Sequence, residues 1–96
     1  MTADVTLLVL LSLSSGPKHG YAIQDDVARE TGVRLGPGSL YGAIARLEGD
    51  GLISALRSDG RRRPYQITDL GLRELREKTK SLNALVLLAR SRLAPE

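Results

Sequence analysis

The chain has 96 residues, of which 42% are hydrophobic and 26% are charged, a balance typical of a folded protein and not of a disordered one. The absence of cysteine excludes disulfides and thiolate metal sites, and a single histidine disfavours a zinc site. The net charge of +3 favours a polyanionic partner. We therefore expect one small domain without a cofactor, which would gain stability from a partner subunit because a short chain buries little surface.

An apolar run from Val5 to Leu13 lies near the N-terminus, where a secretory signal would also place one. Asp4 stands where such a signal needs positive charge, and the run is shorter than the roughly 20 residues that span a bilayer. We predict instead a first helix, capped by Thr2, whose apolar side chains surround it and must be covered on several sides. A cytoplasmic protein without membrane contact is the expectation.

Two further helices are predicted in the first half of the chain. One begins near His19 and ends at Gly32. The next begins at Pro37, whose fixed φ suits the first position of a helix, and closes at residues 49–51. The apolar residues that recur with helical spacing on this third helix form its core stripe, which comprises Leu40, Ala43, Ile44 and Leu47.

The face of the third helix opposite this stripe carries small residues, namely Gly38, Gly42, Ala45 and Gly49. Small residues let a helix backbone approach another surface closely, and Ser39, Tyr41 and Arg46 beside them supply groups that contact phosphates and guanine edges. The major groove of DNA admits such a helix. A recognition helix for duplex DNA is one interpretation, and a solvated surface helix with incidental glycines is the other.

The hydrophobic period changes from that of a helix to that of a strand after residue 51. Alternation over 53–57 and 65–68, with Asp59-Gly60 between them, predicts a two-stranded hairpin. Its tip carries Arg61, Arg62 and Arg63, which have only Asp59 as a nearby carboxylate in the sequence. The tip is therefore interpreted as a basic wing that contacts phosphates, with a loop kept basic for solubility as the alternative.

A long last helix is predicted from about Asp69 to Leu93, with Thr68 as its cap. Its apolar positions alternate spacings of three and four, which is typical of a helix–helix seam. A winged-helix core is too small to cover a helix of this length, so we predict a two-fold dimer. The predicted interface comprises Leu7, Leu8 and Leu11 of the first helix and Leu72, Leu75, Leu82, Leu85, Val86, Ala89 and Leu93. A last helix that folds back on its own domain is the alternative.

These elements together predict a mainly α fold with a small β-hairpin. Residues 1–68 form a winged helix-turn-helix DNA-binding domain in this interpretation, and residues 69–96 form a C-terminal dimerisation helix. The two parts are expected to make one compact unit.

The sequence resembles the PadR family of bacterial transcriptional regulators over nearly the whole chain, and three segments carry the resemblance. They are Gly16-Pro17-Lys18-His19-Gly20-Tyr21-Ala22-Ile23, then Leu35-Gly36-Pro37-Gly38-Ser39-Leu40-Tyr41 with Arg46-Leu47-Glu48 and Gly51-Leu52-Ile53, and finally Gly60-Arg61-Arg62-Arg63-Pro64-Tyr65 with Ile67-Thr68 and Gly71. The resemblance implies a winged helix-turn-helix homodimer that binds a pseudo-palindromic operator and represses transcription. Relatives commonly carry proline where this chain has Gly42, so the shape of that helix turn and its base preference do not carry over.

The resemblance also implies which residues contact double-stranded DNA. They are Lys18, His19 and Tyr21 near the start of the second helix, Gly38, Ser39, Tyr41, Gly42 and Arg46 of the third, and Arg61, Arg62 and Arg63 of the wing. Some relatives bind a small-molecule effector near the dimer interface. This chain has three tyrosines and no tryptophan or phenylalanine, so its sequence does not indicate an aromatic-lined pocket for one.

Two other classes of function compete with DNA binding. Gly36, Gly38 and Gly42 imitate a phosphate-binding glycine pattern of an enzyme, but the buried strand and βαβ unit that such a pattern needs do not accompany them. His19 has no positioned third group for nucleophilic catalysis. A winged helix that binds protein or RNA is the stronger rival, since fold does not determine function.

Overall fold

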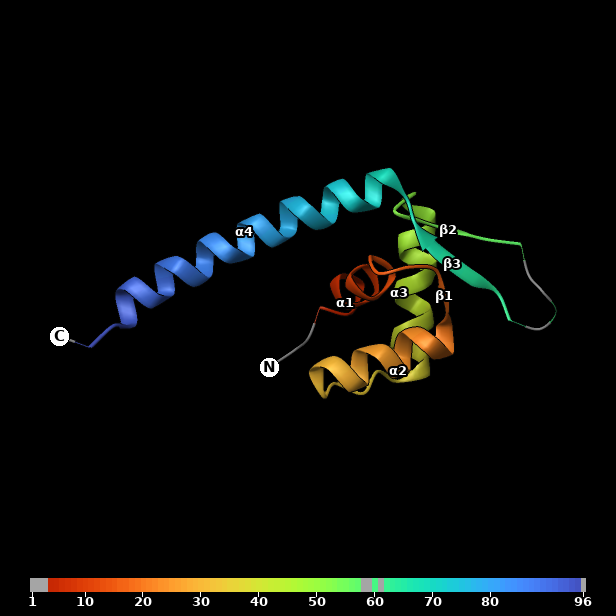
Figure 1. The fold of residues 1–96 in the computed structure, drawn as a ribbon, viewed down its shortest axis with the longest axis horizontal. Coiled ribbons are helices and arrows are strands. Elements are labelled where there is room, and N and C mark those ends of the chain that lie inside the picture. The colour runs from red at the N-terminus through yellow and green to blue at the C-terminus, as the bar shows by residue number, and fades with distance from the viewer. Residues whose placement is uncertain (1–3, 58–59, 61, 96) are drawn as a thin grey trace.

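The protein is described from a computed structural model, which covers residues 4–57, 60 and 62–95. Within these residues the elements are α1 (Val5–Leu13), β1 (Lys18–His19), α2 (Gly20–Thr31), α3 (Pro37–Gly49), β2 (Ile53–Ala55), β3 (Pro64–Ile67) and α4 (Asp69–Leu93). Figure 1 shows α1, α2 and α3 gathered beside the strands, with α4 extending away from them. This is the predicted mainly α winged-helix architecture with a long final helix.

The sheet has three strands and not the two that the sequence predicts. β3 is the central strand and pairs antiparallel with β2, where Ile53 lies opposite Ile67, and with β1, where Lys18 lies opposite Tyr65. Because β1 has only two residues, it produces no alternating pattern from which it could be predicted. The predicted alternation also extended too far, since β2 ends at Ala55.

The hydrophobic core lies where α1, α2 and α3 meet the sheet and the start of α4. The predicted stripe of α3 is buried in full. The core comprises Val9, Leu10, Leu13, Ile23, Val27, Leu35, Leu40, Ala43, Ile44, Leu47, Ile53 and Leu75. Every helix of the described chain contributes to it, so burial of one shared apolar cluster orients all of them.

The first helix begins later than predicted. Asp4 is its N-cap, since the Asp4 carboxylate accepts a hydrogen bond from the Leu7 amide at 3.2 Å and another from the Thr6 hydroxyl at 2.7 Å. These hydrogen bonds, the one from Thr6 foremost, hold the pKa of the Asp4 carboxyl below its usual value because they favour the charged form. The predicted cap, Thr2, lies outside the described residues.

The other helix boundaries agree with the sequence. Gly32 ends α2 with a φ of 75°, a left-handed conformation that glycine adopts without strain. Pro37 occupies the first turn of α3, and Thr68 caps α4 by accepting a hydrogen bond from the Gly71 amide at 3.0 Å. Local chemistry therefore determines where α2, α3 and α4 start or stop.

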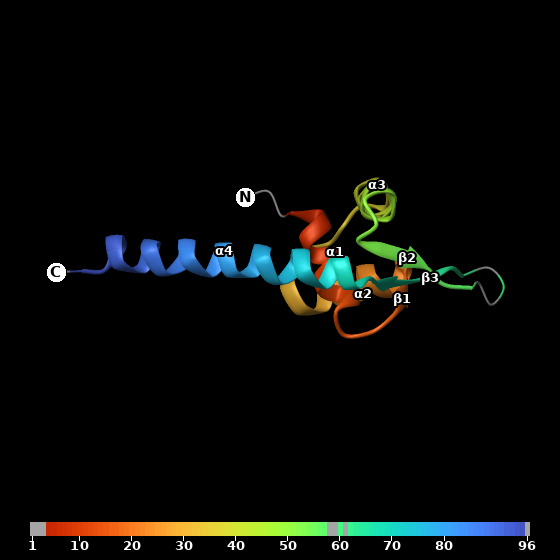
Figure 2. The same ribbon diagram turned by 90° about the horizontal axis from the view of Figure 1, so that it is seen from above.

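The last helix is anchored at its start and uncovered along the rest of its length. Gly71 and Leu75 are buried, whereas every residue from Arg76 to Pro95 is exposed. Both views show α4 leaving the domain as an arm (Figures 1 and 2), which gives the chain extents of 59 × 26 × 20 Å. The alternative in which this helix folds back on its own domain is therefore wrong.

Replacement of Gly71 by alanine tests the junction between α4 and the sheet. A Cβ at Gly71 would lie 2.1 Å from the Leu52 carbonyl oxygen and 2.7 Å from Ile67 Cγ1, and the Leu52 backbone cannot turn aside. Overpacking of this kind costs about 1–3 kcal/mol or more, so we expect Gly71→Ala to lower the free energy of unfolding by that amount. Urea unfolding followed by circular dichroism measures it.

Gly42→Ala is the control for this measurement. A Cβ at Gly42 would meet no atom within 4 Å, and alanine favours a helix interior by about 1 kcal/mol, so this variant should be at least as stable as the wild type. Equal stability of the Gly71→Ala and Gly42→Ala proteins would contradict the tight junction.

Candidate nucleic-acid interface

The small-residue face of α3 is open to solvent. Gly38, Gly42, Ala45 and Gly49 are all exposed, opposite the buried stripe. A Cβ on any of these three glycines would meet no atom within 4 Å. The helix continues without a break through Gly42. Another surface can therefore approach the α3 backbone closely along this face.

The N-terminus of α3 is also available to a ligand. Its N-cap, Gly36, has no side chain to accept a hydrogen bond, and Pro37 follows at the start of the helix. The amides of Gly38 and Ser39 in the first turn therefore have no side-chain cap. Such amides, together with the helix dipole, favour an anion such as a phosphate.

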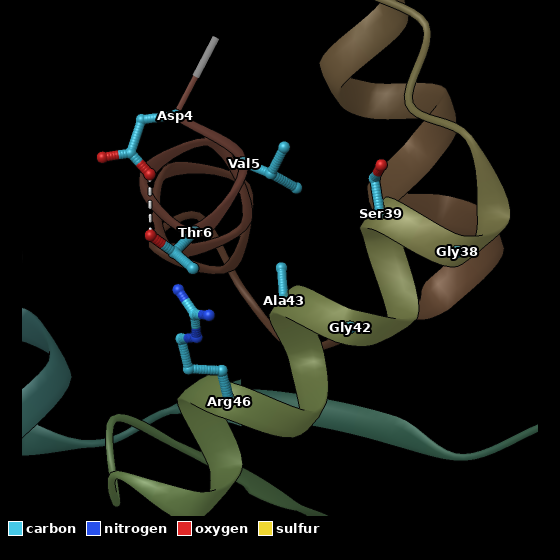
Figure 3. A pocket seen from close by; sticks show the side chains of 8 residues that line it. All are labelled: Asp4, Val5, Thr6, Gly38, Ser39, Gly42, Ala43 and Arg46. Atoms are coloured by element: carbon cyan, nitrogen blue, oxygen red, sulfur yellow. Dashed lines mark hydrogen bonds between the residues drawn. The ribbon is translucent and has the colours of Figure 1, made fainter. Parts of the chain in front are cut away.

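A groove of about 450 Å³ separates α3 from the first turn of α1 (Figure 3). Gly38, Ser39, Gly42, Ala43 and Arg46 form one wall, and Asp4, Val5 and Thr6 form the other. The Arg46 guanidinium reaches from α3 toward Thr6 in Figure 3. Among the residues that the structure describes, Arg46 makes no hydrogen bond and no ion pair, so its guanidinium can bind a ligand in this groove.

A second group of predicted contacts meets between α2, α3 and the wing, the segment 56–63 that joins β2 to β3. We call it the wing-side cluster, and it comprises His19, Gly20, Tyr21, Tyr41, Arg62, Arg63 and Tyr65 around a pocket of about 230 Å³. Its tyrosine side chains at 21 and 41 are 68% and 53% exposed. Phenol and guanidinium groups from α2, α3, β3 and the wing are thus presented at one place. Arg61, the remaining predicted contact of the wing, lies outside the described residues.

His19 connects the start of α2 to the wing. Its Nδ1 accepts the amide hydrogen of Ala22 at 3.3 Å and so caps α2, while its Nε2 lies 3.4 Å from a guanidinium nitrogen of Arg62. The His19 ring also stacks with that of Tyr21, with 6.5 Å between the ring centroids. A neutral imidazole accepts at only one nitrogen, so the capping bond and the Arg62 contact compete. His19 therefore lies between α2 and the wing, and the DNA contact predicted for it stays a prediction.

Lys18 has a different place from the other predicted contacts. Its ammonium donates to the Ser12 carbonyl, to the Ser15 hydroxyl at 2.8 Å and to the Gly16 carbonyl at 3.4 Å. These bonds satisfy groups at the C-terminal end of α1, where a cation also complements the helix dipole. The structure thus uses Lys18 to close the turn between α1 and β1, and the DNA contact predicted for it stays a prediction.

The predicted dimer-interface residues divide into buried and exposed members. Leu75 belongs to the core of the single chain, and Leu7, Leu8 and Leu72 are half-buried, so they would offer little surface to a partner. The exposed members are Leu11, Leu82, Leu85, Val86, Ala89 and Leu93, with Leu87 and Leu88 exposed beside them. We call the exposed predicted members of α4 the α4 apolar strip, which comprises Leu82, Leu85, Val86, Ala89 and Leu93.

An apolar groove of about 560 Å³ runs between α1 and α4. Leu11, Leu72 and Leu75 line it together with polar side chains of α4 such as Thr79 and Asn83. The groove joins the exposed surface of α1 to the beginning of the α4 apolar strip. Within the described part of the chain, no element covers this surface.

Several residues that line the site were not predicted as DNA contacts from the sequence, and Asp4, Thr6 and Gly20 are three of them. Asp4 and Thr6 line the groove beside Arg46, and Gly20 lies in the wing-side cluster. A capping residue directly before an apolar run is a signal that could have identified Asp4. Gly20 has no such signal, because its place in the site depends on Tyr41 of another helix.

The described ranges 4–57, 60 and 62–95 hold no cluster of three or more acidic or histidine side chains that could bind a metal ion. In the same ranges, no helix has both the length and the apolar composition needed to cross a bilayer.

Comparisons with known proteins agree with this arrangement. The family model described as the transcriptional regulator PadR-like family matches residues 8–77. A transcriptional regulator of Mycobacterium tuberculosis is 36% identical over 86 residues, which are 86% of this chain and 79% of that protein. A 37.1 kDa protein in transposon Tn4556 of Streptomyces fradiae is 52% identical over 77 residues. These are 80% of this chain, and they span only 22% of the transposon protein.

Solved structures show the same fold. The crystal structure of a PadR family transcriptional regulator from Eggerthella lenta is similar, with a TM-score of 0.80 and 33% identity. The match covers 93% of this chain and 83% of that one. The family match extends from α1 into α4 and thus includes both the open face of α3 and the wing-side cluster. The chain therefore belongs to the PadR-like family of transcriptional regulators, which are DNA-binding winged-helix proteins and not enzymes.

Proposed function

We propose that this protein binds a specific, pseudo-palindromic operator in duplex DNA as a homodimer and represses transcription there. The observation that supports this most directly is the position of Tyr41. It belongs to α3 and yet lines the same pocket as Arg62 and Arg63 of the wing, so helix and wing share one surface. A helix for the major groove beside a basic loop for the backbone is the arrangement that duplex DNA requires.

In this proposal α3 enters the major groove. The exposed glycines at 38 and 42 let its backbone approach the bases, and the first-turn amide and hydroxyl of Ser39 bind a phosphate. Arg46 binds the edge of a base from the groove beside α1, preferably a guanine, whose O6 and N7 accept both of its donors. Arg62 and Arg63 bind phosphates, and each neutralised phosphate releases counterions.

The homodimer is supported by the α4 apolar strip. Its side chains are uncovered in the protomer, with Leu82, Val86 and Leu85 exposed by 39%, 45% and 61%. A second copy of α4 would bury them, and Leu11 of α1 would join the interface through the groove between α1 and α4. A two-fold dimer would place its α3 helices at half-sites about one DNA turn apart. Residues 69–96 are thus the proposed dimerisation segment.

The same groove suggests where a signal would act. It is apolar and has a volume of about 560 Å³, which is of the size that binds small organic ligands. We propose that a small-molecule effector binds there, at the dimer interface, and that the protein works in the cytoplasm, where bacterial operators lie.

Binding to duplex DNA from the promoter region beside its own gene tests the function. We expect the logarithm of the association constant to fall linearly with the logarithm of salt concentration, since basic side chains release counterions. Arg62→Ala should weaken binding to all sequences alike and reduce the salt slope by about one. Arg46→Ala should cost about 1–3 kcal/mol on the operator and less on random duplex. Fluorescence anisotropy measures both quantities.

Arg73→Ala is the matched control, because this exposed arginine lies about 180° around α4 from Leu82 of the α4 apolar strip and lines neither the groove beside α1 nor the wing-side cluster. It should leave the affinity unchanged. Equal losses on operator and random duplex for Arg46→Ala would remove its base-reading role. Salt-independent binding, or binding to RNA or protein alone, would favour the competing function of a winged-helix interaction module.

Gly42→Ala separates stability from recognition. The added methyl group stabilises α3 by up to about 1 kcal/mol but keeps the helix backbone away from the bases. We therefore expect a protein that is at least as stable as the wild type and binds its operator less tightly. Gly49→Ala adds the same methyl group at the other end of this face and should cost less affinity, because the N-terminal residues of a recognition helix contact the bases. Unchanged operator affinity for Gly42→Ala would show that this face does not contact DNA.

A charge in the α4 apolar strip tests the dimer. Val86→Glu places a carboxylate in the proposed interface and should yield monomers, measured by light scattering coupled to gel filtration. Ala84→Glu is the control, since residue 84 lies about 160° around the helix from residue 86 and is also exposed. A wild-type monomer, or identical behaviour of the two variants, would contradict this interface.

A further inference from the structure

The ring of Tyr41 lies against the backbone of Gly20. A Cβ built on Gly20 would be 2.6 Å from the Tyr41 hydroxyl oxygen and 2.9 Å from each of its ring atoms Cε1 and Cζ. Gly20 is buried and is the first residue of α2, directly after the cap His19. The end of the Tyr41 side chain, which comes from α3, thus occupies the space that any side chain at residue 20 would need.

The hydroxyl group of Tyr41 is available to a ligand in this position. Among the described residues it makes no hydrogen bond, and its side chain is 53% exposed. It lies in the wing-side cluster together with Tyr21, Arg62 and Arg63, and the two guanidinium groups attract anions. A phenolic hydroxyl can donate a hydrogen bond to a phosphate oxygen that these arginines bring close.

We propose that Gly20 is a positioning residue for DNA binding. By lacking a side chain it lets the Tyr41 ring lie on the first turn of α2, which places the Tyr41 hydroxyl at a backbone phosphate of duplex DNA beside the wing. The proposal rests on the proposed DNA-binding function and adds to it a residue that does not itself touch DNA.

The backbone at residue 20 does not itself require glycine. The glycines with positive φ are at positions 16, 32, 51 and 60, so Gly20 has a conformation that alanine also adopts. The three atoms nearest to a Cβ at this position all belong to the end of the Tyr41 side chain, which is half exposed and can turn outward. Gly20→Ala should therefore displace Tyr41 without unfolding the protein, in contrast to Gly71, where the obstacle is backbone.

A double-mutant cycle on affinity for operator DNA tests this role. We expect Gly20→Ala to weaken binding about tenfold, which is the loss of one hydrogen bond to a charged group. Tyr41→Phe should reproduce most of that loss. In the Tyr41→Ala protein, the further change Gly20→Ala should alter affinity by less than about twofold, because the two residues act as one unit.

A measurement on the DNA-free protein tests the structural half separately. The nuclear Overhauser effect between the Gly20 Hα protons and the Tyr41 ring should be present in the wild type. In the Gly20→Ala protein, the nuclear Overhauser effect between residue 20 and the Tyr41 ring should be weaker than in the wild type. The midpoint of thermal unfolding should stay close to that of the wild type. Gly49→Ala, an open glycine on α3, is the control and should change neither quantity.

Two results would overturn the proposal. One is an equal loss of affinity for Gly20→Ala in the wild-type and Tyr41→Ala backgrounds, and the other is a Tyr41 ring that keeps its position in Gly20→Ala. If the wild-type protein binds no duplex at all, the proposed DNA binding is overturned instead. That result comes from the wild-type protein alone, before any variant is compared.

Discussion

The burial of one face of α3 determines what this protein presents to its surroundings. Leu40, Ala43, Ile44 and Leu47 lie in the core against α1 and α2, and this burial orients the helix about its own axis. Because the helix has a fixed angular period, the glycine face opposite must then point outward. The open face that we propose lies against DNA is thus a consequence of how the core is packed.

The surfaces around α3 are organised by short polar contacts between elements. Asp4 caps α1 beside the groove that Arg46 enters, and His19 caps α2 while it contacts the wing through Arg62. The side chains that cap α1 and α2 therefore also line the site. This sharing lets a domain with a small core hold contacts from several elements in register.

Much of the fold could be predicted because local chemistry determines it. Pro37 begins α3, Gly32 ends α2 and Thr68 caps α4, and each acts on backbone within a few residues of itself. The strand β1 could not be predicted, because its two residues pair with Pro64 and Tyr65 of β3, which are far away from them in the sequence. The cap of α1 was misplaced because Thr2 and Asp4 are both suitable capping residues, although only Asp4 stands directly before the apolar run.

For the site, the sequence by itself determined the kinds of group and the face of α3 that carries them, because residue types and a helical period are local properties. Tertiary structure decided which of these groups meet. It directs the Lys18 ammonium to the end of α1 and brings Tyr41 to Gly20 and the wing. It also shows that Leu75 serves the protomer's own core while Val86 stays uncovered. Contacts between distant segments depend on how helices pack in three dimensions, and a one-dimensional pattern does not contain that information.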